Sequence, residues 1–294
     1  MNGPRTALVT DTTAAIESLA PGSSWTVVPL ELEIDGRTYR EGPELSAGEF
    51  HQLLQHANAP PVTLPPSIDA FVETFEGLLE GAERVLAVHL SGELSQTVEH
   101  ARAAARRVDG EGRVRVVDSR LAGAATGLLC LEAEARLAAG EGVDEVAAAL
   151  ESLVERSLVY FSVYTLDYLY LGGRLERMPR TGAATEADRP ILTMRDGRLA
   201  LVERVIGETT RVERMAELVE ERFGREEPLG AVCVHAGPQG QEAARMLEER
   251  VRSAPRGNAT LWRRAPLGPV LCAHTGFDVC GVAAYPRAAS RLVG

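Results

Sequence analysis

Along residues 1–157, short apolar runs that end in polar turns alternate with longer segments whose apolar residues recur at helical spacing. The near-continuous apolar run RVLAVHL, residues 84–90, is typical of a strand that is covered on both faces. Residues 46–57 predict an amphipathic helix that begins with a capping box of Ser46 and Glu49. This alternation predicts a mainly parallel sheet with helices on both faces.

The pattern changes near Leu158. The segment LVYFSVYTLDYLYLGGR, residues 158–174, carries four of the six tyrosines. The later pattern predicts two strands joined by a turn at residues 195–197, followed by further helices and strands. We therefore predict an α/β protein of two domains, an α/β domain at residues 1–157 and an α+β domain at residues 158–294.

Two other local patterns refine this prediction. Asp35-Gly36 lies between two short strand-like runs and predicts a β-hairpin. In the C-terminal segment GPVLCAHTGFDVCGV, the apolar run before His274 predicts a strand, so that His274 would lie in a Gly-rich segment after it. A structural and a functional role for this histidine fit the sequence equally well.

The composition is that of an ordinary globular protein. Of the 294 residues, 45% are apolar and 25% are charged. The apolar runs are shorter than the roughly 20 residues that a membrane helix needs, and the N-terminal sequence MNGPRTALVT has no apolar signal core. We therefore expect a cytoplasmic protein without stable membrane insertion.

Charge and side-chain content exclude several kinds of chemistry. The net charge of -11 argues against broad nucleic-acid binding, which needs a basic footprint. All 31 basic residues are arginine, so neither a Walker A lysine nor a lysine Schiff base is available. The four cysteines are widely spaced and the six histidines form no metal-ligand pattern, so we predict no metal site and no cofactor.

Hydroxyl side chains follow several of the predicted strands. Ligands of open α/β sheets bind outside the carboxyl ends of the strands, where helix N-termini also point unpaired N–H groups. The sequence therefore predicts an anion-sized site of hydroxyls and amides without obligate charge, with Thr63 nearby. The hydroxyls at this edge are Thr12, Thr13, Ser91, Ser95 and Ser119.

These groups also have ordinary structural interpretations. Ser95 is a good N-cap residue, although Val98 rather than Glu or Gln follows three positions later. Thr63 is explained equally well as a loop residue, and the aspartates beside these hydroxyls are typical turn formers. In a further interpretation, a hydrolase would use Ser95 or Ser91 with His274 and an aspartate, although the chain has no G-x-S-x-G elbow.

Seven motifs, taken together, resemble a known family. They occur in the family's order over nearly the whole chain, so their combination is far more specific than any one of them. The family is DegV, the bacterial fatty-acid-binding proteins. The motifs are LVTDTT, PPVTLPPS, HLSGELSQT, VVDSRLAGAATGLL, LDYLYLGGRLER, RPILTMRDGRLALVERV and GPVLCAHTGFDVCGV.

This resemblance implies a long-chain fatty acid buried in a tunnel between the two domains. It implies that Thr63 and Ser95 hold the carboxylate. It also implies a partner, the catalytic subunit of an ATP-dependent fatty acid kinase, which phosphorylates the carboxylate while this protein catalyses nothing and carries the acyl phosphate. The residues expected near the head group are His274, Ser91, Thr275 and Arg204.

The chain departs from the family pattern at positions that concern the kinase. Gln96 stands where the family has a Gly, which would allow a closer backbone approach. Ile206 stands where the family often has an Arg, and Arg204 would point to the same side of an extended strand. A carrier of another amphiphile without kinase coupling therefore stays open, together with the Ser/His hydrolase. These motifs do not determine acyl chain length, unsaturation or oligomeric state.

Overall fold

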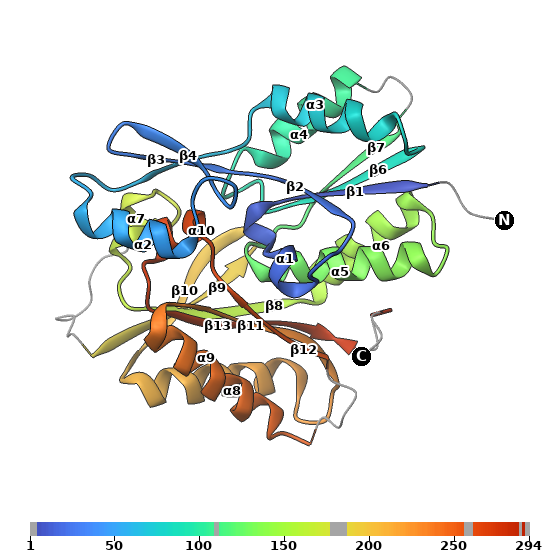
Figure 1. Ribbon diagram of the computed structural model, residues 1–294. Coiled ribbons are helices and arrows are strands. Elements are labelled where there is room, and N and C mark those ends of the chain that lie inside the picture. Colours follow the sequence, from blue (N-terminus) through green and yellow to red (C-terminus); the bar gives the residue numbers. More distant parts are fainter. Residues whose placement is uncertain (1–4, 109–111, 177–186, 256–260, 288–289, 292–294) are drawn as a thin grey trace.

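The protein is built of stacked layers of helices and sheets (Figure 1). The computed structural model describes residues 5–108, 112–176, 187–255, 261–287 and 290–291. From top to bottom in Figure 1, two helices cover a four-stranded sheet, further helices lie beneath it, and a six-stranded sheet follows with two helices on its outer face.

The four-stranded sheet is entirely parallel, in the order β2-β1-β6-β7. Helices α3 and α4 cover one face, and α5 and α6 cover the other, as the strand–helix alternation predicts. The strands are β1 Thr6–Asp11, β2 Trp25–Val28, β6 Arg84–His89 and β7 Val114–Asp118. The helices are α1 Ile16–Leu19, α3 Ile68–Leu79, α4 Thr97–Val108, α5 Ala124–Ala138 and α6 Val143–Arg156, with a 3-10 turn at Thr12–Ala14.

Strand β6 shows why its sequence is apolar without interruption. Val85 and Ala87 pack with Phe71 of α3, whereas Leu86 and Val88 belong to the core on the side of α5. Successive side chains of a strand point to opposite faces, so a strand between two helical layers needs apolar residues at every position.

The six-stranded sheet has the order β10-β9-β8-β13-β11-β12 and is antiparallel except for the pair β11–β12. Helices α8 and α9 cover its outer face, and α5 contacts its inner face. The predicted turn at residues 195–197 joins β9 to β10. The elements are β8 Leu158–Val163, β9 Asp188–Arg195, β10 Arg198–Ile206, α8 Glu208–Phe223, β11 Leu229–Ala236, α9 Gly237–Arg252, β12 Leu261–Pro266 and β13 Val279–Pro286.

A small antiparallel sheet, β4-β3-β5, lies beside these layers with three short helices. The hairpin at Asp35-Gly36 and the capping box of Ser46 and Glu49 are both present as predicted. The elements are β3 Glu31–Ile34, β4 Arg37–Arg40, α2 Ala47–His56, β5 Val62–Leu64, α7 Asp167–Leu171 and α10 Pro269–Thr275.

The prediction of a strand before His274 is wrong, because this apolar run forms the helix α10. Pro269 occupies the first turn of the helix, where its missing N–H costs nothing. Gly276 ends the helix with a φ of 77°, a conformation that favours glycine. These two residues delimit a helix, and their effect outweighs the strand preference of the short apolar run between them.

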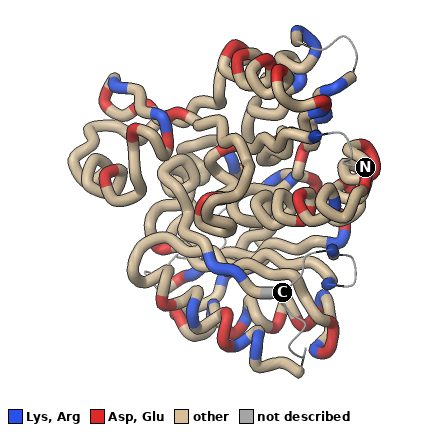
Figure 2. The backbone as a smooth tube through the Cα atoms, turned by 45° about the vertical axis from the view of Figure 1, so that its right-hand side comes forward, with Lys and Arg blue, Asp and Glu red and all other residues tan. Residues whose placement is uncertain are grey.

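The outer helices α8 and α9 carry charges of both signs, interleaved along the lower side of the molecule (Figure 2). Arg214 pairs with Glu203 and Glu221, and Arg245 pairs with Glu242. Exposed pairs of this kind contribute little to stability, because water screens the charges. Within the described residues, no helix is both long and apolar enough to cross a membrane.

Helix α5 lies between the two large sheets and is buried on all sides from Ala124 to Ala133. Its small residues permit this close packing. A Cβ atom at Gly127 would overlap the carbonyl oxygen of Ala14 and the side chain of Leu19. The backbone of α5 therefore rests directly on the turn after β1.

We predict that Gly127→Ala destabilises the protein by about 1–3 kcal/mol, because the added methyl group overpacks a site bounded by backbone. The matched control is Gly77→Ala in α3, where a Cβ atom meets open space. That change should stabilise the protein by up to about 1 kcal/mol through helix propensity alone. Urea unfolding measures both effects, and a stabilised Gly127→Ala variant would contradict the packing argument.

Candidate functional site

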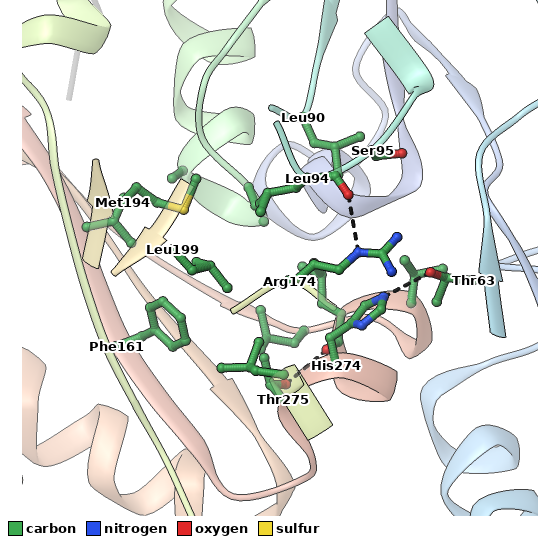
Figure 3. Close-up of a pocket in the computed structure, with 18 of the residues that line it drawn as sticks. Thr63, Leu90, Leu94, Ser95, Phe161, Arg174, Met194, Leu199, His274 and Thr275 are labelled. Carbon is green, nitrogen blue, oxygen red and sulfur yellow. Dashed lines mark hydrogen bonds between the residues drawn. The ribbon is translucent and has the colours of Figure 1, made fainter. Parts of the chain in front are cut away.

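A cavity of about 510 Å³ lies between the turns of the parallel sheet and the inner face of the six-stranded sheet (Figure 3). The loop before α5 and the start of α5 form part of the wall, as do residues of the aromatic segment that begins at Leu158. Apolar side chains make up most of the surface. They include Leu90, Leu94, Ala122, Ala125, Val159, Phe161, Met194, Leu199, Val234, Val270 and Val282.

Polar side chains gather at one end of this cavity, opposite Met194 and Phe161 (Figure 3). Thr63 on β5 and His274 on α10 meet there, with Thr63 Oγ1 2.9 Å from His274 Nε2. The two residues are 211 positions apart in the sequence, so only the tertiary fold brings them together. Ser95 lies at the same end, in the turn before α4.

Ser95 has the capping role that the sequence offered and also lines the cavity. Its Oγ accepts a hydrogen bond from the backbone N–H of Thr97, at 3.3 Å, and shares one with Thr97 Oγ1 at 2.8 Å. It therefore caps the first turn of α4 and lines the cavity at the same time. His100 of α4 shares a hydrogen bond of 2.8 Å with the carbonyl of Pro66, which ties the Thr63 loop to this helix.

Arg174 also lies at the polar end, although sequence reasoning gave it no role. Its Nε donates to the carbonyl of Leu94 at 3.2 Å, and its Nη1 donates to the carbonyl of Gly172. Burial lowers the pKa of this guanidinium from its ordinary value. The predicted site of hydroxyls and amides without obligate charge therefore has a guanidinium beside it. The Gly-Gly-Arg sequence was the available signal.

His274 is held as a neutral imidazole. Burial lowers its pKa to about 4, and the positive charge of Arg174 acts in the same direction. A Cβ atom at Gly172 would overlap His274 Nδ1, so the glycine lets the ring pack against α7. The Nδ1 atom is buried and has no hydrogen-bond partner among the described residues.

Glu41 binds the N-terminal end of α10, opposite the end that carries His274. The residues around Glu41 in the sequence gave no sign of this role. Its Oε1 accepts a hydrogen bond of 3.0 Å from the backbone N–H of Val270. The side chain is 3% exposed, and its Oε2 has no partner in the described part of the chain. Burial raises the pKa of Glu41 to about 7, against the opposing effect of its hydrogen bonds.

Of the other residues predicted near the head group, Thr275 lines the cavity, whereas Ser91 and Arg204 do not. Thr275 lines the cavity, but its Oγ1 lies 3.0 Å from the carbonyl of Leu271, to which it donates. Ser91 is fully buried outside the cavity wall and donates to the carbonyl of Gly197 at 2.7 Å. Arg204 is exposed on β10 and does not line the cavity, and Ile206 nearby is 67% exposed.

The aspartates beside the predicted hydroxyls organise turns. Asp11 accepts hydrogen bonds from the backbone N–H groups of Thr13 and Leu90, and Asp118 accepts from Gly92 and Arg120. Neither aspartate contacts His274 through a hydrogen bond, so the described residues contain no Ser–His–Asp relay around this histidine. They also contain no group of three or more potential metal ligands.

The exposed part of the cavity lining lies in the turn that carries Ser95, and we take the opening of the cavity to be there. Among the described lining residues, the exposed ones are Gly92, Glu93 and Gln96, all within this turn. The polar end of the cavity is therefore the end next to its opening, and the apolar walls extend inward from it.

Comparison with known proteins assigns a family to this arrangement. The family model described as "Uncharacterised protein, DegV family" matches residues 5–287. A DegV domain-containing protein of Streptomyces coelicolor is 34% identical over 283 residues, which cover 96% of this chain and 98% of that relative. The chain belongs to the DegV family. The resemblance carried by the seven motifs is confirmed.

Solved DegV structures have the same fold. A DegV family protein from Thermus thermophilus, described as binding a fatty acid, is 30% identical and superposes with a TM-score of 0.84 over 96% of this chain and 99% of that one. DegV from Bacillus subtilis, described as a fatty acid binding protein, is 25% identical with a TM-score of 0.81 over 97% and 100% of the two chains. The predicted α/β architecture, with a parallel sheet flanked by helices and a second sheet, is that of the DegV fold.

The two titratable groups that contact the ends of α10, Glu41 and His274, predict opposite pH dependences of stability. The pKa of Glu41 is raised, so its contribution is complete below about pH 4.5 and lost as pH rises through about 7. The pKa of His274 is lowered, so its contribution is complete above about pH 6.5 and lost as pH falls through about 4. Each shift corresponds to about 3 kcal/mol.

Urea unfolding at several pH values tests this with Glu41→Gln, which keeps an acceptor for Val270, and with His274→Asn. Relative to the native sequence, Glu41→Gln should gain stability as pH rises from about 4.5 to 7, and His274→Asn should gain as pH falls from about 6.5 to 4. Difference curves that stay flat over these ranges would show that neither group is perturbed.

Proposed function

We propose that this protein binds a long-chain fatty acid in its cavity and presents the carboxylate to an ATP-dependent fatty acid kinase. Thr63 and Ser95 bind the carboxylate, and the protein itself catalyses no reaction. After phosphoryl transfer it carries the acyl phosphate. The observation that carries this proposal is the cavity, whose polar groups gather at one end beside its opening while the rest of the wall is apolar.

The apolar wall supports an acyl chain as the ligand. Each methylene removed from water contributes about 0.8 kcal/mol, so about 15 methylenes contribute roughly 12 kcal/mol before ordering costs. The cavity volume of about 510 Å³ lies within the range of about 300–1,000 Å³ that is usual for ligand pockets. The Thermus and Bacillus relatives described as fatty-acid binding support the same ligand.

The polar end supports orientation of a carboxylate. Thr63 and Ser95 come from different elements and line the same cavity, on either side of Arg174 in Figure 3. The Nη2 of Arg174 has no hydrogen-bond partner among the described residues, so it is available to the same anion. A carboxylate would also supply the counter-charge that this half-buried guanidinium lacks. Because His274 is neutral at pH 7, the site carries a single positive charge rather than two.

The opening supports presentation to a partner. Gly92, Glu93 and Gln96 form its exposed rim, next to Ser95. A carboxylate bound at Ser95 would therefore lie close to solvent, while the acyl chain stays covered. A phosphoryl donor on a partner protein could approach one carboxylate oxygen from this side without unfolding the carrier.

We expect protein purified from cells to retain fatty acids of about 14–18 carbons, because each methylene that the apolar wall removes from water contributes about 0.8 kcal/mol. Thr63→Ala with Ser95→Ala should weaken binding by at least about 100-fold, because each hydrogen bond to a charged group contributes about 1.5–3 kcal/mol. Native mass spectrometry measures the retained acid. The control is Thr38→Ala with Ser18→Ala, which removes two exposed hydroxyls from elsewhere.

A native protein that is empty and stays empty with added fatty acid would overturn the binding proposal. Turnover of an ester that Ser95→Ala abolishes would favour a hydrolase instead.

The kinase proposal predicts that a fatty acid kinase with ATP converts the bound acid to an acyl phosphate. Thr63→Ala with Ser95→Ala should abolish this product, because the carboxylate is no longer oriented. Gln96→Gly should raise the rate, because it removes an exposed side chain from the rim. Mass spectrometry of the hydroxylamine-trapped product gives the rate. Retained binding with no acyl phosphate from any kinase tested would identify a carrier without kinase coupling.

A further inference from the structure

The backbone of the turn between β9 and β10 lies close to Ser91, in the turn before α4. Asp196 and Gly197 both have positive φ values, of 51° and 81°, and Arg195 pairs with Arg198 across them. This is the two-residue turn that matches the twist of a hairpin. A Cβ atom at Gly197 would lie 2.6 Å from Ser91 Oγ, so the position requires glycine for space as well as for conformation.

Among the described residues, three polar contacts join this hairpin tip, residues 195–198, to the turns of the parallel sheet. Ser91 Oγ donates to the carbonyl of Gly197 at 2.7 Å, and Ser91 is fully buried. The other two contacts are exposed ion pairs, which water and salt weaken. They join Arg120 to Asp196 and Glu93 to Arg198. The Ser91–Gly197 bond is therefore the main attachment of the tip.

Strand pairing within the six-stranded sheet gives the described part of the hairpin tip little further support. β10 is an edge strand, and β9 pairs with β8 only through residues 191–193. Beyond Thr193 the hairpin is a two-stranded ribbon, and isolated ribbons of this kind are marginally stable. Directly behind the tip, the cross-strand pair of Met194 and Leu199 forms part of the cavity wall.

The tip also borders the opening of the cavity. Glu93 belongs to the exposed rim and pairs with Arg198, while Gly92 and Glu93 directly follow Ser91. We propose that Ser91 is a positioning residue that fastens the β9–β10 hairpin tip as a removable edge of the cavity opening, so that ligand exchange requires its hydrogen bond to Gly197 to break. This inference rests on the proposed fatty-acid binding.

The test compares exchange rates of the bound acid. Protein loaded with palmitic acid is mixed with excess deuterium-labelled palmitic acid, and native mass spectrometry follows the replacement over time. Ser91→Ala should exchange about tenfold faster than the native protein, because the edge then opens without breaking this hydrogen bond. The affinity should fall much less than the rate rises, which a general loss of structure in the site would not produce.

The chain offers a matched control for the turn. Gly197→Ala and Gly36→Ala both place alanine at a positive φ in an Asp-Gly hairpin turn, but a Cβ atom at Gly36 meets open space. Gly197→Ala should speed exchange, and Gly36→Ala should leave it within twofold of the native rate. Equal rates for the native protein, Ser91→Ala and Gly197→Ala would overturn the proposal.

If the buried substitutions prevent folding, two substitutions of exposed aspartates provide the test instead. Asp196→Asn and Asp144→Asn each remove one exposed partner of an arginine, with native N–O distances of 3.1 Å in both pairs. Exchange should be faster in Asp196→Asn than in Asp144→Asn, and the reverse order or no difference would overturn the proposal. If the native protein binds no fatty acid, the proposed function fails by itself. The hairpin is then tested by the uptake rate of the apolar dye 8-anilinonaphthalene-1-sulfonate, for which the same order of variants is expected.

Discussion

The burial of α5 between two sheets is the constraint on which the rest of the structure depends. A helix keeps the sheets on its two sides roughly its own width, about 10 Å, farther apart than direct contact would. α5 begins only at Ala124, and residues 119–123 separate it from the end of β7, the last strand of the parallel sheet along the chain. The space ahead of its N-terminus is therefore bounded by both sheets without being filled by a helix. The cavity occupies this space, and Ala122, Gly123 and Ala125 form one side of it.

The small sheet closes the polar end of that space by holding α10 at both of its ends. Glu41, next to β4, accepts from the first turn of the helix, and Thr63 on β5 bonds to His274 in its last turn. The Glu41–Val270 bond is buried and the Thr63–His274 bond is partly buried, so protein partners rather than solvent alone hold these side chains. Burial disfavours the charged form of both side chains. It therefore raises the pKa of the Glu41 carboxyl and lowers the pKa of the His274 imidazole.

Local sequence rules predicted the features whose cause is local. The strands, the capping box at Ser46, the Asp-Gly hairpins and the parallel sheet follow from periodicity and turn chemistry, and all are present. They failed for α10, where the boundaries set by Pro269 and Gly276 override the apolar run. They also missed Arg174 and Glu41. Their environments are made by segments far away in the sequence, and neither residue stands in a pattern that marks burial.

The turn from Ser91 to Gln96 shows how one short segment serves two purposes. Ser95 faces the cavity and caps α4, while Ser91 faces the other way and fastens the β9–β10 hairpin. Both depend on the same backbone, because the N–H of Ser95 bonds to the carbonyl of Ser91. The hairpin tip and the hydroxyl proposed to bind the carboxylate are therefore joined through a single turn while the Ser91–Gly197 bond is intact. In the proposed complex, breaking this bond frees the hairpin tip and also removes one constraint on the turn that carries Ser95, so the same step opens the cavity edge and loosens the support of the head group.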